Sequence, residues 1–489
     1  MKKLILFCLL SFSLLFPTFA QEKMPKVMRE FRAMWITTVG NYDFPSAPGL
    51  TAEQQKAEIV NMMNLAQDLK LNAVIFHVRT AGDAFYQSET EPSSYFLTGQ
   101  MGKKLEFDPL KFAIDEAHSR GILIHAWFNP YRASHAAIKG DIPENHISKA
   151  RPDLVRTYNK SQILDPGEKD VRDYVTKVVM DVVNRYDIDG VHFDDYFYPY
   201  KDANQTEFPD DETYKKYKES GGKLGRDDWR RKSVDDFIQN LSVEIKKSKP
   251  TVMFGISPFG IWKPDEINII GTSSFDSQFA DSRKWLHEGW VDYLSPQLYW
   301  SSTKNGQKFP YLLNWWRGEN KKKRHVWAGV ATYKVGDAAH PDFTPEELVL
   351  QINTTRGQLG DGAGAIHYRA KFLLENKGNI REFLKEKVYR GNAVIPPSPW
   401  IDSTLPSPPE LTASKQANGD VSASWKNVGA KQAFRWVLYW DDGKGWKPTV
   451  LPPNMTKANL PANMNVQKVS IAAVDRLGNI SEATVKEVK

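Results

Sequence analysis

The stretch VRDYVTKVVMDVVNRYDIDGVHFDD, residues 171–195, joins two different hydrophobic periodicities. Its first half repeats valine at helical spacing from Val171 to Val183, which predicts an amphipathic helix. Its second half, residues 190–195, is short and apolar and ends on two acids, which predicts a buried strand. A helix that leads into a buried strand is the building unit of a parallel sheet with crossover helices.

The same unit recurs along most of the chain. Segments of strand length alternate with helical segments at residues 31–37, 72–79, 122–129, 190–195, 252–257, 292–300, 325–332 and 364–369. Helix start signals lie between them, such as the capping box of Thr51 and Gln54 and the pair Asp108-Pro109. Eight such units predict a (β/α)8 barrel over residues 28–390. The competing open sheet usually has a glycine-rich phosphate turn after its first strand, and TTVG at residues 37–40 is not one.

The first twenty residues have the pattern of a cleavable signal peptide. Lys2 and Lys3 precede an apolar run, and small residues stand before a cleavage site at Ala20. The single cysteine, Cys8, lies inside this run rather than at the cleavage site, so a lipoprotein anchor is not expected. We therefore expect a periplasmic or secreted protein without a membrane span in its mature form.

The end of the chain has a different character. Residues 391–409 are rich in proline, which predicts a stiff extended linker. Residues 410–489 alternate apolar and polar positions between glycine and proline turns, which predicts a small all-β sandwich.

Composition, charge and the lack of certain motifs argue against several classes of partner and cofactor. The formal net charge is +6 over 489 residues, and we interpret the basic run at residues 321–324 as a solvated turn, so no nucleic-acid partner is expected. No glycine-rich phosphate loop, G-x-S-x-G turn or H-E-x-x-H motif occurs, and we expect no cofactor and no catalytic metal. Aromatic residues make up 12%, which fits either large cores or a cleft that stacks sugar rings.

Alternation along the strands assigns side chains to the inside of the barrel. In residues 190–195, Val191 and Phe193 take the outer face, and His192 and Asp194 then point inward. The same reasoning turns a set of mostly polar residues inward, namely His77, Arg79, His125, Trp127, Asn129, Ser295, Gln297, Tyr299, His367 and Arg369. Because each unpaired buried polar group costs about 1–3 kcal/mol, such a set is expected only around a cavity or in satisfied networks.

Asp194 and Asp195 would then stand at the C-terminal opening of the barrel, where such folds carry their active sites. Paired carboxylates are the apparatus of glycoside hydrolysis. At this separation one pKa should rise, which suits a proton donor. The alternatives are a helix cap, an ion pair with Arg79 or Arg132, or a metal site that includes His192.

Rings and polar groups follow the same strand ends. The candidates for substrate binding here are His77, Arg79, Asn129, Tyr131, Arg132, His192, Trp262, Gln297, Tyr299, Trp300 and Tyr333. About half of the aromatic residues near the opening are expected to be core or loop anchors. Residues 201–226 form a long polar stretch that we interpret as a lid or extra subdomain over the cleft.

Several motifs resemble the glycosyl-hydrolase-like family ten of bacterial envelope and secreted proteins. They are EFRAMWITTVGNYDFPS (30–46), FHVRTAGDAFY (76–86), HAWFNPYR (125–132), LDPG (164–167), DGVHFDDYFYP (189–199) and FADSRKW…VDYLSPQLYW (279–300). The resemblance covers about residues 28–389. The tail, with PPELTAS, VSASW, FRWVLYW and VSIAAVDRLGNIS, resembles a fibronectin type III module.

The resemblance implies a TIM barrel that acts on carbohydrate, and some members of the family cleave peptidoglycan glycan strands stripped of peptide. Asp194 and Asp195 fall on the family's paired acids. Other recurrent polar positions correspond to Asp83, Asn129, Arg132 and Asp281. One departure is Pro92-Ser93-Ser94, where the family often has Pro-Trp-Ser, so one stacking residue is missing.

The sequence thus predicts an exported glycoside hydrolase that cleaves O-glycosidic bonds in a cell-wall or other polysaccharide. Asp194 would be nucleophile or charge stabiliser and Asp195 the proton donor, or the reverse. Asp281 or Asp83 would be further acid candidates across the cleft. The alternatives are a non-catalytic carbohydrate-binding or scaffold protein and a metal-dependent polysaccharide deacetylase.

Overall fold

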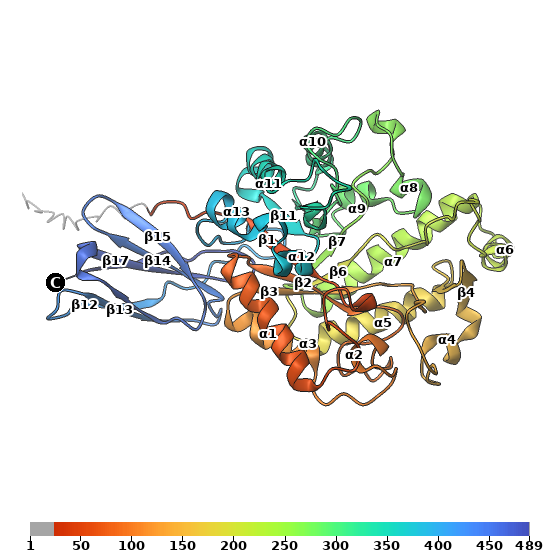
Figure 1. Ribbon diagram of the computed structural model, residues 1–489, viewed down its shortest axis with the longest axis horizontal. Coiled ribbons are helices and arrows are strands. Elements are labelled where there is room, and N and C mark those ends of the chain that lie inside the picture. Colours follow the sequence, from red (N-terminus) through yellow and green to blue (C-terminus); the bar gives the residue numbers. More distant parts are fainter. Residues whose placement is uncertain (1–23, 489) are drawn as a thin grey trace, which may run out of the picture.

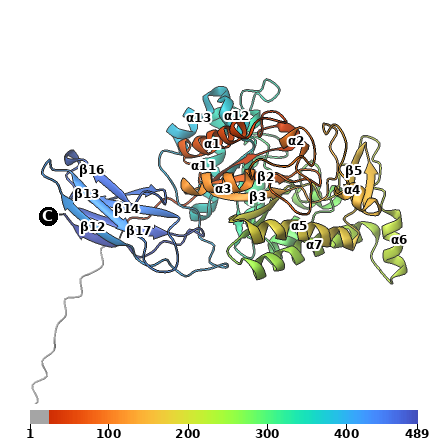
Figure 2. The ribbon, with the colours of Figure 1, turned by 90° about the horizontal axis from the view of Figure 1, so that it is seen from below.

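A computed structural model describes residues 24–488 of the chain. The predicted signal peptide lies outside the described residues. Figures 1 and 2 show a helix-covered barrel with a β-sandwich at one end and a group of short elements at the other. Between residues 24 and 488, no helix is both long and apolar enough to cross a bilayer.

The strands expected from the sequence form one parallel sheet. They are β1 (Phe31–Ile36), β2 (Ala73–Arg79), β3 (Leu123–Phe128), β6 (Gly190–Phe193), β7 (Met253–Ile256), β8 (Tyr293–Leu294), β9 (His325–Val326), β10 (Ala328–Val330) and β11 (Gly364–His367). The sheet order is β10-β11-β1-β2-β3-β6-β7-β8-β9, so its two outermost strands are consecutive in the chain and separated only by Trp327. A parallel bridge from Gln297, just beyond β8, to Gly329 of β10 joins these ends. β9 and β10 are the two halves of the seventh expected strand, and the (β/α)8 prediction is confirmed.

Helices lie between successive strands and cover the outside of the ring (Figure 1). They are α1 (Ala52–Asp68), α3 (Pro109–Ser119), α5 (Lys169–Arg185), α7 (Arg226–Ser248), α9 (Ser282–Glu288), α10 (Phe309–Glu319), α11 (Pro345–Leu359) and, after β11, α12 (Ala370–Glu375). Shorter helices are α2 (Tyr95–Thr98), α4 (Ile147–Ala150), α6 (Asp211–Glu219), α8 (Ser274–Ser277) and α13 (Ile380–Phe383). The capping box of Thr51 and Gln54 is present at α1, and the Asp108 side chain accepts a hydrogen bond from the backbone N–H of Lys111 at α3.

Side chains alternate between the two faces of the strands, but in the last strand the face assigned to the interior is the wrong one. Val191 and Phe193 pack in the outer core, and His192 lies inside, next to Trp35. In β11, however, the prediction that His367 and Arg369 point inward is wrong. Ile366 and, just beyond the strand, Tyr368 pack against the interior cluster.

His367 faces the helices, where its ring nitrogens contact Thr332 Oγ1 at 2.9 Å and Tyr389 Oη at 3.0 Å. Arg369 forms an ion pair with Asp43 at 2.8 Å. Polarity therefore did not mark the inward face, because both residues have polar partners outside the ring.

The C-terminal region consists of two antiparallel sheets, β12-β13-β16 and β15-β14-β17-β18. The strands are β12 (Glu410–Lys415), β13 (Val421–Lys426), β14 (Arg435–Asp441), β15 (Trp446–Leu451), β16 (Lys457–Leu460), β17 (Lys468–Val474) and β18 (Thr484–Glu487). Trp425 from one sheet and Trp436 and Ile471 from the other share one buried core. The predicted all-β sandwich is confirmed, and its likeness to a fibronectin type III module stays a prediction.

The sandwich closes the N-terminal end of the barrel, which we call the floor (Figures 1 and 2). Phe434 and Leu477 of the sandwich belong to the same buried cluster as Phe31 and Trp327 inside the ring. Phe31 and Trp327 stack with their ring centroids 3.7 Å apart. The barrel interior is therefore continuous with side chains from the C-terminal region.

Polar contacts fix this docking. Arg435 is buried, and its Nε donates to the carbonyl oxygen of Gly121, just before β3, at 2.7 Å. Arg476 forms an ion pair with Asp187, just before β6, at 2.6 Å. The expected linker also packs on the barrel, since Trp400 Nε1 donates to Asp292 Oδ1 at 2.9 Å. Residues 391–409 thus do not act as a free spacer.

The opposite, C-terminal end of the ring is the mouth. Beyond it lie α4, α6 and the hairpin of β4 (Val155–Tyr158) and β5 (Ser161–Leu164) (Figures 1 and 2). The hydroxyl of Tyr158 donates to the carbonyl oxygen of Thr206 at 2.7 Å, and the Thr213 hydroxyl donates to Asp165 at 2.5 Å. The stretch expected to be a lid therefore forms a subdomain at the rim, together with the hairpin.

Candidate active site

A cleft of about 140 Å³ opens at the mouth of the barrel, and we call it the acid cleft. Its lining residues lie at or just beyond the C-terminal ends of six strands of the ring. They are Trp35, Trp127, Asp194, Asp195, Tyr196, Tyr200, Ser257, Gln297, Tyr299 and Tyr368. The predicted gathering of the Asp194–Asp195 pair with strand-end aromatic residues at one opening is thus present.

Asp194 is held by donors from two directions and is only 8% exposed. Its Oδ2 accepts a hydrogen bond from Trp127 Nε1 at 3.2 Å. Its Oδ1 accepts one from the backbone N–H of Tyr196, also at 3.2 Å. Both bonds are long, and neither donor carries a charge.

Asp195 is 5% exposed and is held more tightly. The hydroxyl of Tyr200 donates a short hydrogen bond to Oδ2. Gln297 Nε2 donates to Oδ1 at 3.1 Å and is itself fixed by the carbonyl oxygen of Ser257 at 3.1 Å. Each oxygen of Asp195 thus has a side-chain donor.

These surroundings act differently on the pKa values of the two carboxyl groups. Burial, and secondly the charge of Asp195, raise the pKa of Asp194 to about 7. Burial also raises the pKa of Asp195, but the hydrogen bonds from Tyr200 and Gln297 oppose that rise. Of the two carboxyl groups, Asp194 is therefore better suited to hold a proton, and Asp195 is the one whose ionised form is stabilised by side-chain hydrogen bonds.

Aromatic rings form the walls of the acid cleft. Tyr196 and Tyr200 meet edge to face at 5.4 Å, and Phe259 lies 5.5 Å beyond Tyr200. On the other side, Tyr299 stacks on Tyr368 at 5.9 Å with an interplanar angle of 26°. Flat apolar faces beside buried acids are suited to hold a sugar ring.

A chain of hydrogen bonds below the cleft fixes Trp35. Its Nε1 donates to His192 Nε2 at 3.2 Å. Because an indole only donates, the proton of His192 is on Nδ1, which donates to the Tyr293 oxygen at 2.9 Å. The Tyr293 hydroxyl then donates to His125 Nδ1 at 2.8 Å. Burial lowers the pKa of both histidines, so the chain is uncharged.

Several predicted binding residues support the cleft from behind its lining. His77 stacks on Trp127 with ring centroids 3.9 Å apart. The Arg132 guanidinium lies over the ring of Tyr196 at 4.9 Å. Tyr333 packs its edge against Tyr299 at 6.0 Å. Asp194, Asp195, Gln297 and Tyr299 line the cleft directly.

Other predicted binding residues frame the loops instead. Arg79 forms a buried ion pair with Glu91 at 2.6 Å. Asp83 Oδ1 accepts hydrogen bonds from Thr80 and Ala81 within its own loop. Asn129 Oδ1 accepts from the backbone N–H of Arg132 at 2.9 Å. None of Arg79, Asp83 and Asn129 lines the acid cleft.

A third group lies away from the cleft. Asp281 Oδ1 caps α9 through the backbone N–H of Lys284 and accepts a hydrogen bond from Trp262 Nε1 at 3.0 Å. Tyr131 and Trp262 belong to the outer core, and Trp300 packs against it. Asp281 is thus not among the residues that line the acid cleft with Asp194 and Asp195.

Sequence reasoning missed several lining residues. Trp35 shares the inward face of β1 with Phe31 and Ala33, so alternation alone would have found it. Tyr368 was assigned to the wrong face of its strand. Tyr200 stands five residues beyond Asp195 in a loop, and no strand period places its hydroxyl.

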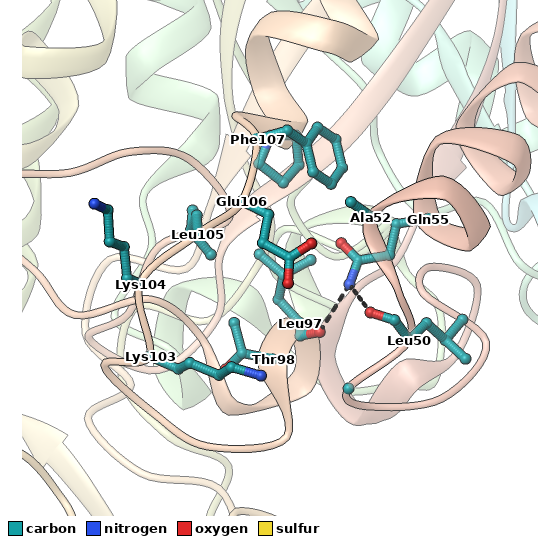
Figure 3. Close-up of a pocket in the computed structure, with 12 residues that line it drawn as sticks. Leu50, Ala52, Gln55, Leu97, Thr98, Lys103, Lys104, Leu105, Glu106 and Phe107 are labelled. Carbon is teal, nitrogen blue, oxygen red and sulfur yellow. Dashed lines mark hydrogen bonds between the residues drawn. The ribbon is translucent and has the colours of Figure 1, made fainter.

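A second, smaller cavity of about 40 Å³ lies between the start of α1, α2 and the loop before α3 (Figure 3). Gln55 Nε2 points between the carbonyl oxygens of Leu50 and Leu97 and donates to both, at 2.8 and 3.2 Å. Glu106 is its single acidic lining residue. This cavity shares no lining residue with the acid cleft and lacks a carboxylate pair.

The metal alternative can be compared with the described side chains. Within residues 24–488, no cluster of three or more His, Cys, Asp or Glu side chains is arranged to hold a metal ion. His192 could have joined Asp194 and Asp195 in such a set. Both of its ring nitrogens are instead engaged by Trp35 and Tyr293.

Comparison with known proteins identifies the family of the chain. A family model described as glycosyl hydrolase-like 10 matches residues 30–344. The chain is 37% identical to glycosyl hydrolase YngK of Bacillus subtilis (strain 168), over 94% of each chain. It is 37% identical to glycosyl hydrolase DigH of Escherichia coli (strain K12), over 70% of this chain and 83% of that protein.

Among solved structures, the glycoside hydrolase domain of PgaB (BpsB) from Bordetella bronchiseptica aligns with a TM-score of 0.49 at 13% identity. The alignment covers 74% of this chain and 99% of that one. The extent of the family match and the identity to YngK establish the relationship. The chain belongs to the glycosyl hydrolase-like 10 family and is a glycoside hydrolase.

Proposed function

We propose that this glycoside hydrolase is exported and cleaves O-glycosidic bonds in a cell-wall glycan, with peptide-free peptidoglycan strands as its substrate. The observation that carries the proposal is the pair of buried carboxyl groups in the acid cleft, of which Asp194 is held by weak neutral donors and Asp195 by two side-chain donors. The signal-peptide pattern supports export, and the resemblance of the motifs to the family supports the substrate.

In the proposed reaction, Asp194 is the general acid and Asp195 the ionised partner. Asp194 donates its proton to the glycosidic oxygen while the bond from that oxygen to the anomeric carbon breaks. The positive charge that develops on the sugar faces the carboxylate of Asp195. Water finally supplies hydroxide to the anomeric carbon, and its remaining proton returns to Asp194.

The attacking group is either Asp195 or, in a sugar with a 2-acetamido group, the acetamido oxygen of the substrate. Tyr200 and Gln297 hold both oxygens of Asp195, which suits a carboxylate that stabilises positive charge. The stereochemistry of the product, followed by NMR, reports whether the anomeric configuration is retained.

Two asparagine variants test the roles. Asp194→Asn should lower kcat on glycan strands by roughly 100- to 10,000-fold, since it removes the general acid. It should retain much more activity on an aryl glycoside whose leaving group needs no proton. Asp195→Asn should lose activity on both substrates, because neither substrate bypasses charge stabilisation.

Asp281→Asn is the matched control, because the same chemical change is made at a carboxylate that caps a helix. Its activity should stay within about twofold of the wild type, since asparagine caps helices as well as aspartate. If Asp194→Asn cleaves strands at the wild-type rate, the assignment of the acid is wrong. If the wild type binds strands but releases no reducing ends, a binding or scaffold role replaces the proposal. Released acetate and sensitivity to chelators would instead favour a deacetylase.

A further inference from the structure

Arg132 is a charged residue of the mouth that the proposed reaction leaves unused. Its Nη1 donates to the carbonyl oxygen of Thr80 at 3.2 Å, and its guanidinium lies over the ring of Tyr196. A guanidinium has five N–H donors. No other hydrogen bond from this guanidinium to residues 24–488 is found, so most of its donors are available.

Two other arginines near the strand ends are neutralised by carboxylates. Arg79 pairs with Glu91 at 2.6 Å, and Arg369 pairs with Asp43 at 2.8 Å. For Arg132, no carboxylate oxygen of residues 24–488 lies within 4.0 Å of a side-chain nitrogen. Arg132 is half-buried, and its charge is not neutralised by a carboxylate, so the guanidinium can still pair with an anionic ligand.

The position of Arg132 connects it to the acid cleft. It lies against Tyr196, which lines the cleft and follows Asp195 in the chain. After the dominant effect of burial, its charge is among those that lower the pKa of Asp194 and Asp195. Its side-chain nitrogens are not among the buried atoms of residues 24–488 that lack a hydrogen-bond partner, so those without a bond are open to solvent.

We propose that Arg132 binds a carboxylate carried by the substrate sugar, so that the enzyme selects acidic glycans. This inference rests on the proposed function. A planar guanidinium with free donors pairs with a carboxylate through two parallel hydrogen bonds. In a peptide-free glycan strand, each lactyl group ends in a free carboxylate, whereas a strand with peptides has an uncharged amide at that position.

The experiment measures binding, so that it does not depend on turnover. The full chain with Asp194→Asn is titrated calorimetrically with peptide-free strands and with the same strands after their carboxyl groups are reduced to alcohols. Adding Arg132→Gln should weaken binding of the acidic strands by roughly 10- to 100-fold, the range of a hydrogen-bonded charge. Binding of the reduced strands should change by less than about threefold.

Two further variants separate this role from others. Arg132→Lys keeps the charge but not the planar fork, and it should recover only part of the affinity for acidic strands. Arg369→Gln removes a charge at the same end of the barrel that Asp43 already neutralises, and it should not change the ratio between the two strands.

The proposal is overturned if Arg132→Gln weakens both strands equally, because Arg132 then acts through Tyr196 or the acids. It is also overturned if the Asp194→Asn protein binds the reduced strands as tightly as the acidic ones. Neither result affects the glycosidase proposal, which is decided by the release of reducing ends from the wild type.

Discussion

The two ends of this barrel contrast in how their polar groups are satisfied. At the floor, Arg435 and Arg476 of the sandwich are bound to the segments before β3 and β6, and Phe434 completes the interior packing. At the mouth, Asp194 is held only by long bonds from neutral donors, and Arg132 has no carboxylate partner among the described residues. The contacts at the floor stabilise the fold. The polar groups at the mouth, in contrast, still have donors and acceptors that a substrate can use.

The contrast predicts that substitutions at the floor lower the free energy of unfolding and leave kcat unchanged. Phe434→Ala should lower the free energy of unfolding by about 3–5 kcal/mol, since it removes a buried ring. Urea denaturation measures this loss, and kcat well below the unfolding temperature should stay unchanged. Met455→Ala, at an exposed position of the same region, should cost less than about 0.5 kcal/mol. A large loss of kcat in a folded Phe434→Ala protein would remove the distinction between the two ends.

The mouth should show the opposite behaviour in Tyr200→Phe. The change removes the hydroxyl that donates to Asp195 and leaves the ring, so the pKa of Asp195 should rise. We expect kcat/KM at pH 7 to fall about tenfold, the value of one hydrogen bond to a charge, with little change in unfolding temperature. A tenfold loss that is independent of pH would argue against an effect on the ionisation of Asp195.

The protonation of Asp194 should appear in both activity and stability. Because its pKa is about 7 in the folded protein and about 4 in an unfolded chain, the folded state binds more protons between these values. Its contribution to stability is therefore present at low pH and is lost as the pH rises through about 7. The unfolding temperature of the wild type relative to Asp194→Asn should rise from pH 8 to pH 5, and kcat/KM should fall above about pH 7. Parallel curves for the two proteins would contradict this.

The smallest expected effect concerns Asp281, which caps α9 and does not line the acid cleft. Asp281→Ala removes the cap of α9 and the partner of Trp262, and it should cost about 1 kcal/mol of stability. Its kcat should be unchanged. A strong loss of activity without loss of stability would return Asp281 to the list of catalytic candidates.

Local patterns in the sequence were sufficient for the barrel and for part of the candidate site. Helix caps and apolar runs define eight strand–helix units, which predict a closed barrel. Alternation from Val191 and Phe193 then placed Asp194 on the inward face at the mouth. In β11 alternation also holds, but polarity pointed to the wrong face, because His367 has polar partners outside the ring. Strand alternation also could not predict the position of Tyr200, because Tyr200 contacts Asp195 from a loop.

The docking of the sandwich had no local signal. Phe434 and Arg435 read as ordinary residues at the start of a strand, and Gly121 as an ordinary end of a helix. Their contact joins residues that are more than three hundred positions apart. Only the folded arrangement shows that the proline-rich segment is anchored and that the C-terminal region completes the barrel.

The chain from Trp35 through His192 and Tyr293 to His125 has a fixed direction, because its first member only donates. With the protons so arranged, this column of four side chains carries no charge. Trp35 at its upper end cannot accept a proton, because an indole nitrogen only donates. The column therefore supplies no proton to the acid cleft at Trp35, and Asp194 is hydrogen-bonded to Trp127 and Tyr196 rather than to any member of it. In the proposed reaction, the proton that returns to Asp194 comes from the attacking water, which enters by the same opening as the glycan.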